Sequence, residues 1–171
     1  YETANGAKVA SDLVEERNSK YYHIETGEEL KQIVAKMSKS LKNVVNPDDV
    51  IERFGADSLR LYEMFMGPLD ERKPWAENGV KGVFNFLNRV YRFFTELDNI
   101  TGGEEDKEVE KLLHQTIQKV EFDIDRLKFN TGISALIIFN NLAIKKGKVT
   151  KNTAETFAKI LSPYAPHMAE E

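Results

Sequence analysis

The sequence contains no cysteine, and this one absence excludes several kinds of chemistry. Disulfides, thiolate zinc sites and cysteine nucleophiles are ruled out together, and the composition is compatible with a reducing, cytoplasmic environment. No apolar run approaches the roughly 20 residues that a helix needs to span a bilayer. Neither His114 nor His167 has a second ligand at metal spacing, so we expect no metal site.

An excess of positive charge is also missing. The net charge is −4, so the chain has no overall attraction to nucleic acid, whose binding usually appears as a basic surface. Lysines gather at two places in the sequence. The first lysine cluster comprises Lys31, Lys36, Lys39 and Lys42, and the second lysine cluster comprises Lys145, Lys146, Lys148 and Lys151. Clusters of this kind are more often solvated surface than binding sites. With 41% hydrophobic residues, the chain can bury a core in one or two small domains.

The pattern of apolar and turn-forming residues predicts a mostly α-helical fold that follows a small β-containing segment. Residues 8–14 and 20–24 are candidate strands, and Thr26 and Gly27 supply turn chemistry. Residues 28–35 could form a helical turn or another extended stretch, and the pattern does not decide between them.

Clear signals for the start of a helix first occur at Asn46, which is a good N-cap for a helix that begins at Pro47. Two aspartates in the first turn complement the helix dipole, and Gly55 suits the left-handed residue after the helix. Asp57 or Ser58 is then expected to cap a second short helix, which ends at Gly67 and Pro68.

A bundle of longer helices is predicted after a connector at 69–75. The expected helices span 76–97, 104–127, a third that is capped by Asn130 or Thr131 and ends at 144, and 153–161, with a last helix after Pro166. The first two carry apolar stripes at Val83, Leu87, Val90, Phe94 and Leu97, and at Leu113, Ile117, Val120, Ile124 and Leu127. The third is apolar on most sides, so it is expected at the centre of the bundle.

The run Lys36-Met37-Ser38-Lys39-Ser40 is the most informative motif, because specific residues follow it. They are Asn43, Val45, Pro47, Gly55, Ala56, Asp57, Leu59 and Arg60. Together with the run, which we call the KMSKS loop (residues 36–40), they resemble the mobile ATP-binding loop of class I aminoacyl-tRNA synthetases. Isoleucyl and valyl enzymes share this much, whereas the continuation at 60–69 and 86–92 is most similar to leucyl-tRNA synthetases.

The resemblance implies that Lys39 contacts the ATP phosphates and that Lys36 supports it electrostatically. These are the candidate catalytic residues. Negative charge builds on the leaving pyrophosphate when leucine is activated, and a preorganised cation stabilises it. Ser38 and Ser40 would shape the loop and would bind ATP together with Lys39, the serines through hydroxyl hydrogen bonds and the lysine through its ammonium group. Met37 is expected to be a buried anchor.

The resemblance also implies a domain organisation. Residues 1–35 would be the end of a β-containing leucine-specific insertion, 36–70 the KMSKS loop with its stem-contact helices, and 71–171 a truncated anticodon-binding-type bundle. We expect a piece of a longer, cytoplasmic and monomeric leucine-tRNA ligase whose partners are tRNA(Leu), leucine and ATP with Mg²⁺. The family's second signature, His-x-Gly-His, does not occur in the sequence, so the piece is expected to be inactive alone.

Two alternatives remain open. One is an isoleucyl- or valyl-type synthetase, and the other is a non-catalytic helical RNA-binding module that uses Arg89, Arg92 and the second lysine cluster. Other conspicuous residues are given structural roles: His114, His167, the packing anchor Trp75, and the pair Asp123 and Asp125, whose side chains diverge on a helix.

Overall fold

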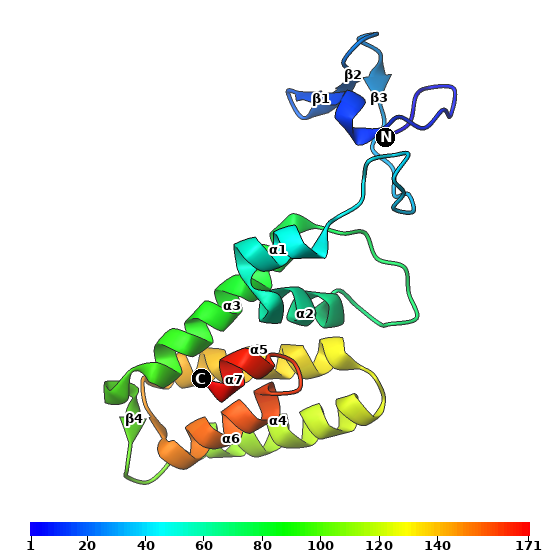
Figure 1. The fold of residues 1–171 in the computed structure, drawn as a ribbon. Coiled ribbons are helices and arrows are strands. Elements are labelled where there is room, and N and C mark those ends of the chain that lie inside the picture. The colour runs from blue at the N-terminus through cyan, green and yellow to red at the C-terminus, as the bar shows by residue number, and fades with distance from the viewer. The chain divides into compact units, whose positions relative to one another are not determined.

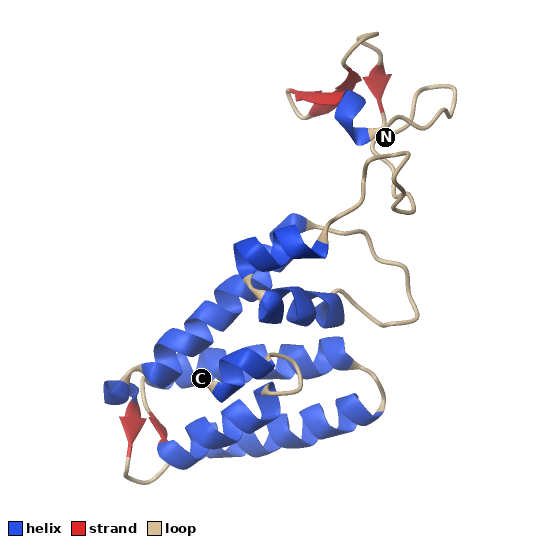
Figure 2. Ribbon diagram, viewed as in Figure 1, coloured by secondary structure: helices blue, strands red, loops and turns tan.

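The computed structural model describes residues 1–171, which form two compact units at 1–49 and 50–171. Each unit is described by itself. The domain boundaries expected near residues 35 and 70 stay predictions, since they follow the family pattern rather than compactness. The prediction of a mostly α-helical chain with a small β-containing segment is confirmed (Figure 2).

The N-terminal unit is built on a three-stranded antiparallel sheet of β1 (Val14–Arg17), β2 (Lys20–His23) and β3 (Glu29–Leu30), in that order. Asn18 and Ser19 have φ of 52° and 63°, the left-handed pair that a two-residue hairpin turn requires. The candidate strand at 20–24 is confirmed as β2. The stretch 28–35, for which the pattern did not decide between a helical turn and an extended segment, contains β3.

The candidate strand at 8–14 is wrong. Ser11–Leu13 forms a 3-10 turn, and β1 begins only at Val14. The cause is a long-range hydrogen bond, in which the Ser11 amide donates to the carbonyl of Leu41 at 2.9 Å instead of to a neighbouring strand.

Two short helices come next. Helix α1 (Pro47–Phe54) begins where the sequence predicts, and the Asn46 side chain accepts a hydrogen bond from the Asp48 amide at 3.2 Å. Gly55 follows at φ 83°, and α2 (Ala56–Phe65) starts directly after it. The expected cap at Asp57 or Ser58 is therefore wrong, because both residues lie inside the first turn of α2.

The remaining helices form the bundle. They are α3 (Glu77–Thr95), α4 (Lys107–Asp125), α5 (Phe129–Lys146), α6 (Lys151–Leu161) and α7 (Pro166–Glu170). Helices α4 and α5 run side by side as a hairpin (Figure 1). A 3-10 turn at Leu97–Asn99 leads to β4 (Ile100–Thr101), which pairs in parallel with β5 (Val149–Thr150).

Helix α5 lies at the centre, as predicted, and contacts α2, α3 and α4. Its buried face carries the fully enclosed side chains Ile133, Leu136, Phe139 and Ala143. Its start is two residues earlier than expected, so Asn130 and Thr131 lie in the first turn instead of capping it.

Each of the two predicted apolar stripes, on α3 and on α4, includes a last leucine that lies beyond the end of the helix. Leu97 is 83% exposed and Leu127 is 59% exposed, because each follows the end of its helix. Leu127 has φ 55° in the turn between α4 and α5, which aims its side chain away from the stripe. None of the helices combines the length and apolar character needed to cross a bilayer.

Candidate functional site

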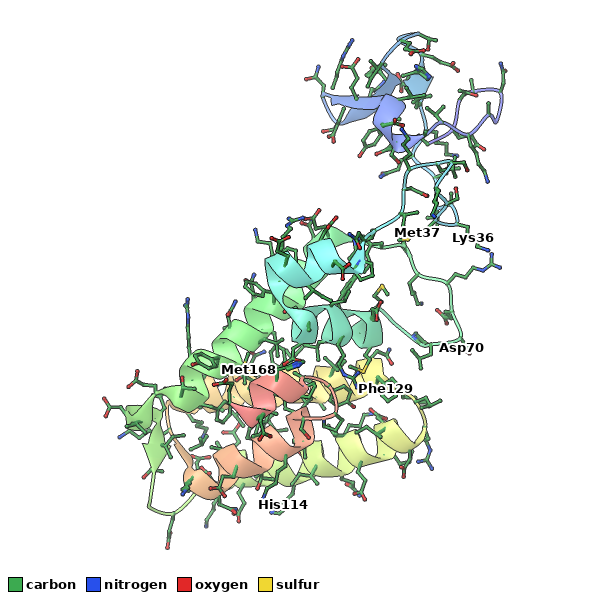
Figure 3. The ribbon with its side chains drawn as sticks, viewed as in Figure 1. Lys36, Met37, Asp70, His114, Phe129 and Met168 are labelled. Carbon is green, nitrogen blue, oxygen red and sulfur yellow. The ribbon has the colours of Figure 1, made fainter.

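The KMSKS loop lies outside regular structure, between β3 and α1, and Figure 3 labels its first two residues. It folds back on itself through short-range hydrogen bonds. The side-chain oxygen of Asn43 accepts from the Ser38 amide at 2.9 Å, and Ser38 Oγ accepts from the Leu41 amide at 3.3 Å. Ser38 Oγ also lies 3.2 Å from Ser40 Oγ. Both hydroxyls therefore take part in the shape of the loop.

The base of the loop is fixed within the N-terminal unit. Lys42 has φ 47°, which turns the chain sharply after the loop, and its ammonium forms an ion pair with Asp12. The hydrogen bond from Lys42 lowers the pKa of the Asp12 carboxyl, although slight desolvation opposes it. The preceding residue, Leu41, accepts the Ser11 hydrogen bond described above. The 3-10 turn at 11–13 thus holds the loop at two adjacent residues.

Lys36 and Lys39 are both exposed, and neither ammonium takes part in an ion pair. Lys42, only three residues beyond Lys39, is committed to Asp12. The loop therefore presents two uncompensated positive charges on flexible stems, an arrangement suited to an anion such as a phosphate group.

The prediction that Met37 is a buried anchor is wrong. Its side chain is 42% exposed.

The Gly-Ala-Asp segment after α1 has a structural role within the helical unit. Asp57 is 8% exposed and accepts hydrogen bonds from the Met168 amide at 2.7 Å and from the His167 ring Nδ1 at 2.8 Å. Arg60, one turn later, donates to the carbonyl of Pro163 at 2.9 Å. Two residues of the motif thus bind the segment that leads into α7.

The cations proposed for an RNA-binding module are partly engaged by other side chains. Arg89 donates to Asn141 Oδ1 at 3.2 Å, while Arg92 is exposed. In the second lysine cluster, Lys146 pairs with Asp106 at 3.0 Å and with Glu108 at 2.8 Å. Lys151 lies 3.6 Å from Glu155. Half of that cluster is therefore neutralised by carboxylates of the same unit.

The residues that were given structural roles lie in structural surroundings. Trp75 packs edge-on against Tyr62, with ring centroids 5.0 Å apart. Asp123 is fully buried and pairs with Lys119, whereas Asp125 is exposed. His114 lies exposed on α4 (Figure 3), and no group of three or more potential metal ligands comes together anywhere in the chain.

Sequence reasoning missed two residues that organise the loop. Asn43 was recognised only as part of a family pattern, and the signal that could have found it is the amide side chain placed directly after a lysine- and serine-rich turn. Asp12 carries no local signal, since its partner Lys42 is 30 residues away.

Two family models match the chain. Residues 30–71 match the model described as tRNA synthetases class I (I, L, M and V), and residues 106–171 match the anticodon-binding domain of tRNA ligase. The first match contains the KMSKS loop, α1 and α2. The second contains α4 to α7.

A solved structure gives a consistent result. The agnB2 LeuRS of Agrobacterium radiobacter K84, in a ternary complex with tRNA and LeuAMS, is similar with a TM-score of 0.71 and 32% sequence identity. The match covers 79% of this chain and 20% of that one, so the chain spans about a fifth of the length of this relative. The chain therefore belongs to the class I aminoacyl-tRNA synthetases and carries the family's anticodon-binding domain, with a leucyl-tRNA synthetase among its structural relatives.

Proposed function

We propose that this chain is part of a leucine-tRNA ligase, which activates leucine with ATP and transfers it to tRNA(Leu). The KMSKS loop would supply the contact to the ATP phosphates, and the helical bundle would contact the tRNA. The single observation that carries the proposal is the loop itself, which is internally hydrogen-bonded and presents two unpaired lysines within a segment that matches class I synthetases.

The chemistry assigns separate roles to the loop residues. In the activation step the leucine carboxylate attacks the α-phosphate of ATP, and pyrophosphate leaves with its bonding electrons. Lys39 would stabilise the negative charge that develops on the pyrophosphate, and Lys36 would raise the local positive potential. Ser38 and Ser40 would keep the turn in shape and offer hydroxyls to phosphate oxygens. Mg²⁺ would accompany ATP as part of the substrate.

Leucine specificity is supported by the similarity to a leucyl-tRNA synthetase at 32% identity. Contact with tRNA is supported by the match of 106–171 to an anticodon-binding domain and by the tRNA in the complex of that relative. A cytoplasmic location remains part of the proposal, and so does a monomeric state. The isoleucyl- or valyl-type alternative shares the first family match, which groups these enzymes together.

The test is Lys39→Ala in the full-length protein, with leucine-dependent ATP–pyrophosphate exchange as the measurement. We expect the exchange rate to fall by about 10²–10³-fold, the usual cost of losing a donor that stabilises transition-state charge. Lys31→Ala is the matched control, because Lys31 is an exposed lysine in the same matched segment but outside the loop.

An unchanged exchange rate in Lys39→Ala, with Lys31→Ala also unchanged, would contradict the role of the loop. Replacing leucine by isoleucine or valine in the same assay separates the leucyl from the other two types. A higher exchange rate with either of those amino acids would transfer the assignment to that enzyme.

A further inference from the structure

We propose that Asn43 is the positioning residue of the KMSKS loop, whose amide clamps the loop so that its lysines reach the phosphates in one arrangement. This inference rests on the proposed function. Asn43 would not touch ATP. It would act through the backbone of the residues that do.

The clamp uses both ends of one side chain. The Asn43 oxygen Oδ1 accepts from the Ser38 amide at 2.9 Å, and the nitrogen Nδ2 lies 3.5 Å from the carbonyl of Lys36, to which it donates. These two contacts fall on either side of Met37 and close a ring of backbone from residue 36 to residue 43. Asn43 is half-buried, and its contact to the Ser38 amide is partly shielded from water, whereas its contact to the Lys36 carbonyl is exposed.

An amide suits this arrangement. A single side chain must accept from an N–H and donate to a C=O, and the asparagine amide does both in neutral form through two separate atoms, its oxygen and its nitrogen. An aspartate at this position would keep the acceptor for Ser38 but would lose the donor to Lys36. A glutamine would keep both groups but carry them one methylene further from the backbone.

The clamp differs in kind from the anchor at the loop base. The pairing of Lys42 with Asp12 ties the loop to the 3-10 turn at 11–13, whereas every contact of the Asn43 amide is inside the segment 36–43. A loop that moves over its substrate would keep an internal clamp but strain an external anchor. Asn43 is therefore suited to preserve the shape of the loop while the loop changes position.

The effect on the reaction is preorganisation. Long lysine side chains lose much conformational freedom when they bind, and a mobile backbone adds to that loss. When the backbone is fixed between residues 36 and 38, Lys36 and Lys39 sample fewer conformations before they bind. They therefore lose less conformational entropy when they contact the phosphates.

The experiment is a double-mutant cycle in the full-length protein, built from Asn43→Ala, Lys39→Ala and the combined variant. The measurement is ATP–pyrophosphate exchange, with kcat and the KM for leucine determined separately. We expect Asn43→Ala alone to lower kcat on the order of tenfold, as the loss of a partly shielded hydrogen bond predicts, with little change in the KM for leucine. In the Lys39→Ala background, the same substitution should lower kcat less than twofold, because the lysine that contacts the phosphates is gone and only the supporting Lys36 is left to position.

Two more variants sharpen the result. Asn43→Asp, which loses only the donor and adds a negative charge near the lysines, should also lower kcat. Val44→Ala, which truncates an adjacent side chain that is 54% exposed, is the matched control and should stay within about twofold of the parent. Circular dichroism melting of each variant tests whether the fold is kept.

The outcomes are distinguishable. If the effects of Asn43→Ala and Lys39→Ala multiply in the combined variant, Asn43 acts independently of Lys39 and the inference is overturned. An unchanged kcat in Asn43→Ala overturns it as well. If Lys39→Ala alone leaves kcat unchanged, it is the proposed function that fails, whatever Asn43 does. If Asn43→Ala lowers kcat and the melting temperature together and the effect persists without Lys39, Asn43 has a purely structural role.

Discussion

The buried carboxylates of the helical unit hold segments together. Asp123 accepts a hydrogen bond from the Thr131 hydroxyl and pairs with Lys119, which joins α4 to the first turn of α5. Tyr164 is fully buried against Gly132, and its hydroxyl has no hydrogen-bond partner. Burial, together with a smaller effect of the nearby Asp123 carboxylate, raises the pKa of Tyr164 to about 12, so the phenol stays protonated at neutral pH.

Glu105 offers a test of such contacts through pH. Its carboxylate accepts from the Thr150 amide and hydroxyl, each at 2.9 Å, and from the Thr153 hydroxyl at the start of α6. Burial alone would raise the pKa of Glu105, but these hydrogen bonds outweigh it and hold the pKa below its usual value of 4.5. The charged form is therefore favoured by folding, and its contribution is present above pH 4.5 and is lost as the pH falls through the lowered value.

We expect Glu105→Gln to lower the free energy of unfolding at pH 7 by about 1 kcal/mol, a modest figure because the carboxylate is partly exposed and screened. The difference from the parent should shrink as the pH falls through the lowered pKa of the parent carboxyl, which then becomes protonated. Urea unfolding at a series of pH values measures this. Glu104→Gln is the control, since Glu104 is exposed and forms no such contacts. A difference that stays constant down to pH 3 would show that charge is not involved.

At the scale of elements, α2 and α3 pack closely where the Tyr62 ring of α2 lies against Gly79 of α3, and the space there admits no side chain at position 79. A Cβ on Gly79 would lie 2.4 Å from the Tyr62 ring. Tyr62 cannot easily move, because its hydroxyl accepts from the Ala76 amide at 3.0 Å and its ring packs against Trp75. One turn further along α3, a Cβ on Gly82 would meet nothing within 4 Å.

These two glycines form a matched pair of substitutions on one helix. Gly79→Ala should destabilise the helical unit by about 1–3 kcal/mol, as overpacking does. Gly82→Ala should stabilise it by about 0.5–1 kcal/mol, because alanine favours a helix. Denaturant unfolding followed by the fluorescence of Trp75, the only tryptophan, reports on this contact directly. Equal effects of the two substitutions would mean that Tyr62 yields at little cost.

The sequence predicted most elements but not all of their ends. The start of α1 was predictable because Asn46 and Pro47 carry capping information in their own chemistry. The start of α5 was not, since the residue before it, Lys128, makes no side-chain cap and Asn130 offered a misleading one. In the loop, the motif identified Lys36 and Lys39, but exposure of Met37 depends on what packs over it, which no local pattern encodes.

At the scale of the whole molecule, the KMSKS loop and the bundle are parts of one proposed reaction but do not by themselves complete it. The chain spans about a fifth of its leucyl relative, and the His-x-Gly-His signature implied by the family does not occur in its sequence. The lysines of the KMSKS loop, in the role proposed for them, would therefore lack a bound nucleotide on which to act.

We expect the purified 171-residue chain to give no leucine-dependent ATP–pyrophosphate exchange above background. The same assay on the full-length protein is the positive control, and circular dichroism shows whether the shorter chain is folded. Clear exchange by the folded 171-residue chain would mean that these residues contain a complete activation site, and the assignment of the loop as half of one would have to be given up.

The contact between Asp57 and His167 also has a consequence for how the protein is made. The two residues are 110 positions apart, so α2 emerges from the ribosome long before its partners exist. At a synthesis rate of about 5–20 residues per second, Asp57 waits roughly 5–20 s for His167 and Met168. During that interval the carboxylate is open to water and α2 lacks one side of its packing. Formation of these contacts therefore waits for the synthesis of α7, and a ribosome that stalls in α6 would hold a nascent protein in which α2 still lacks them.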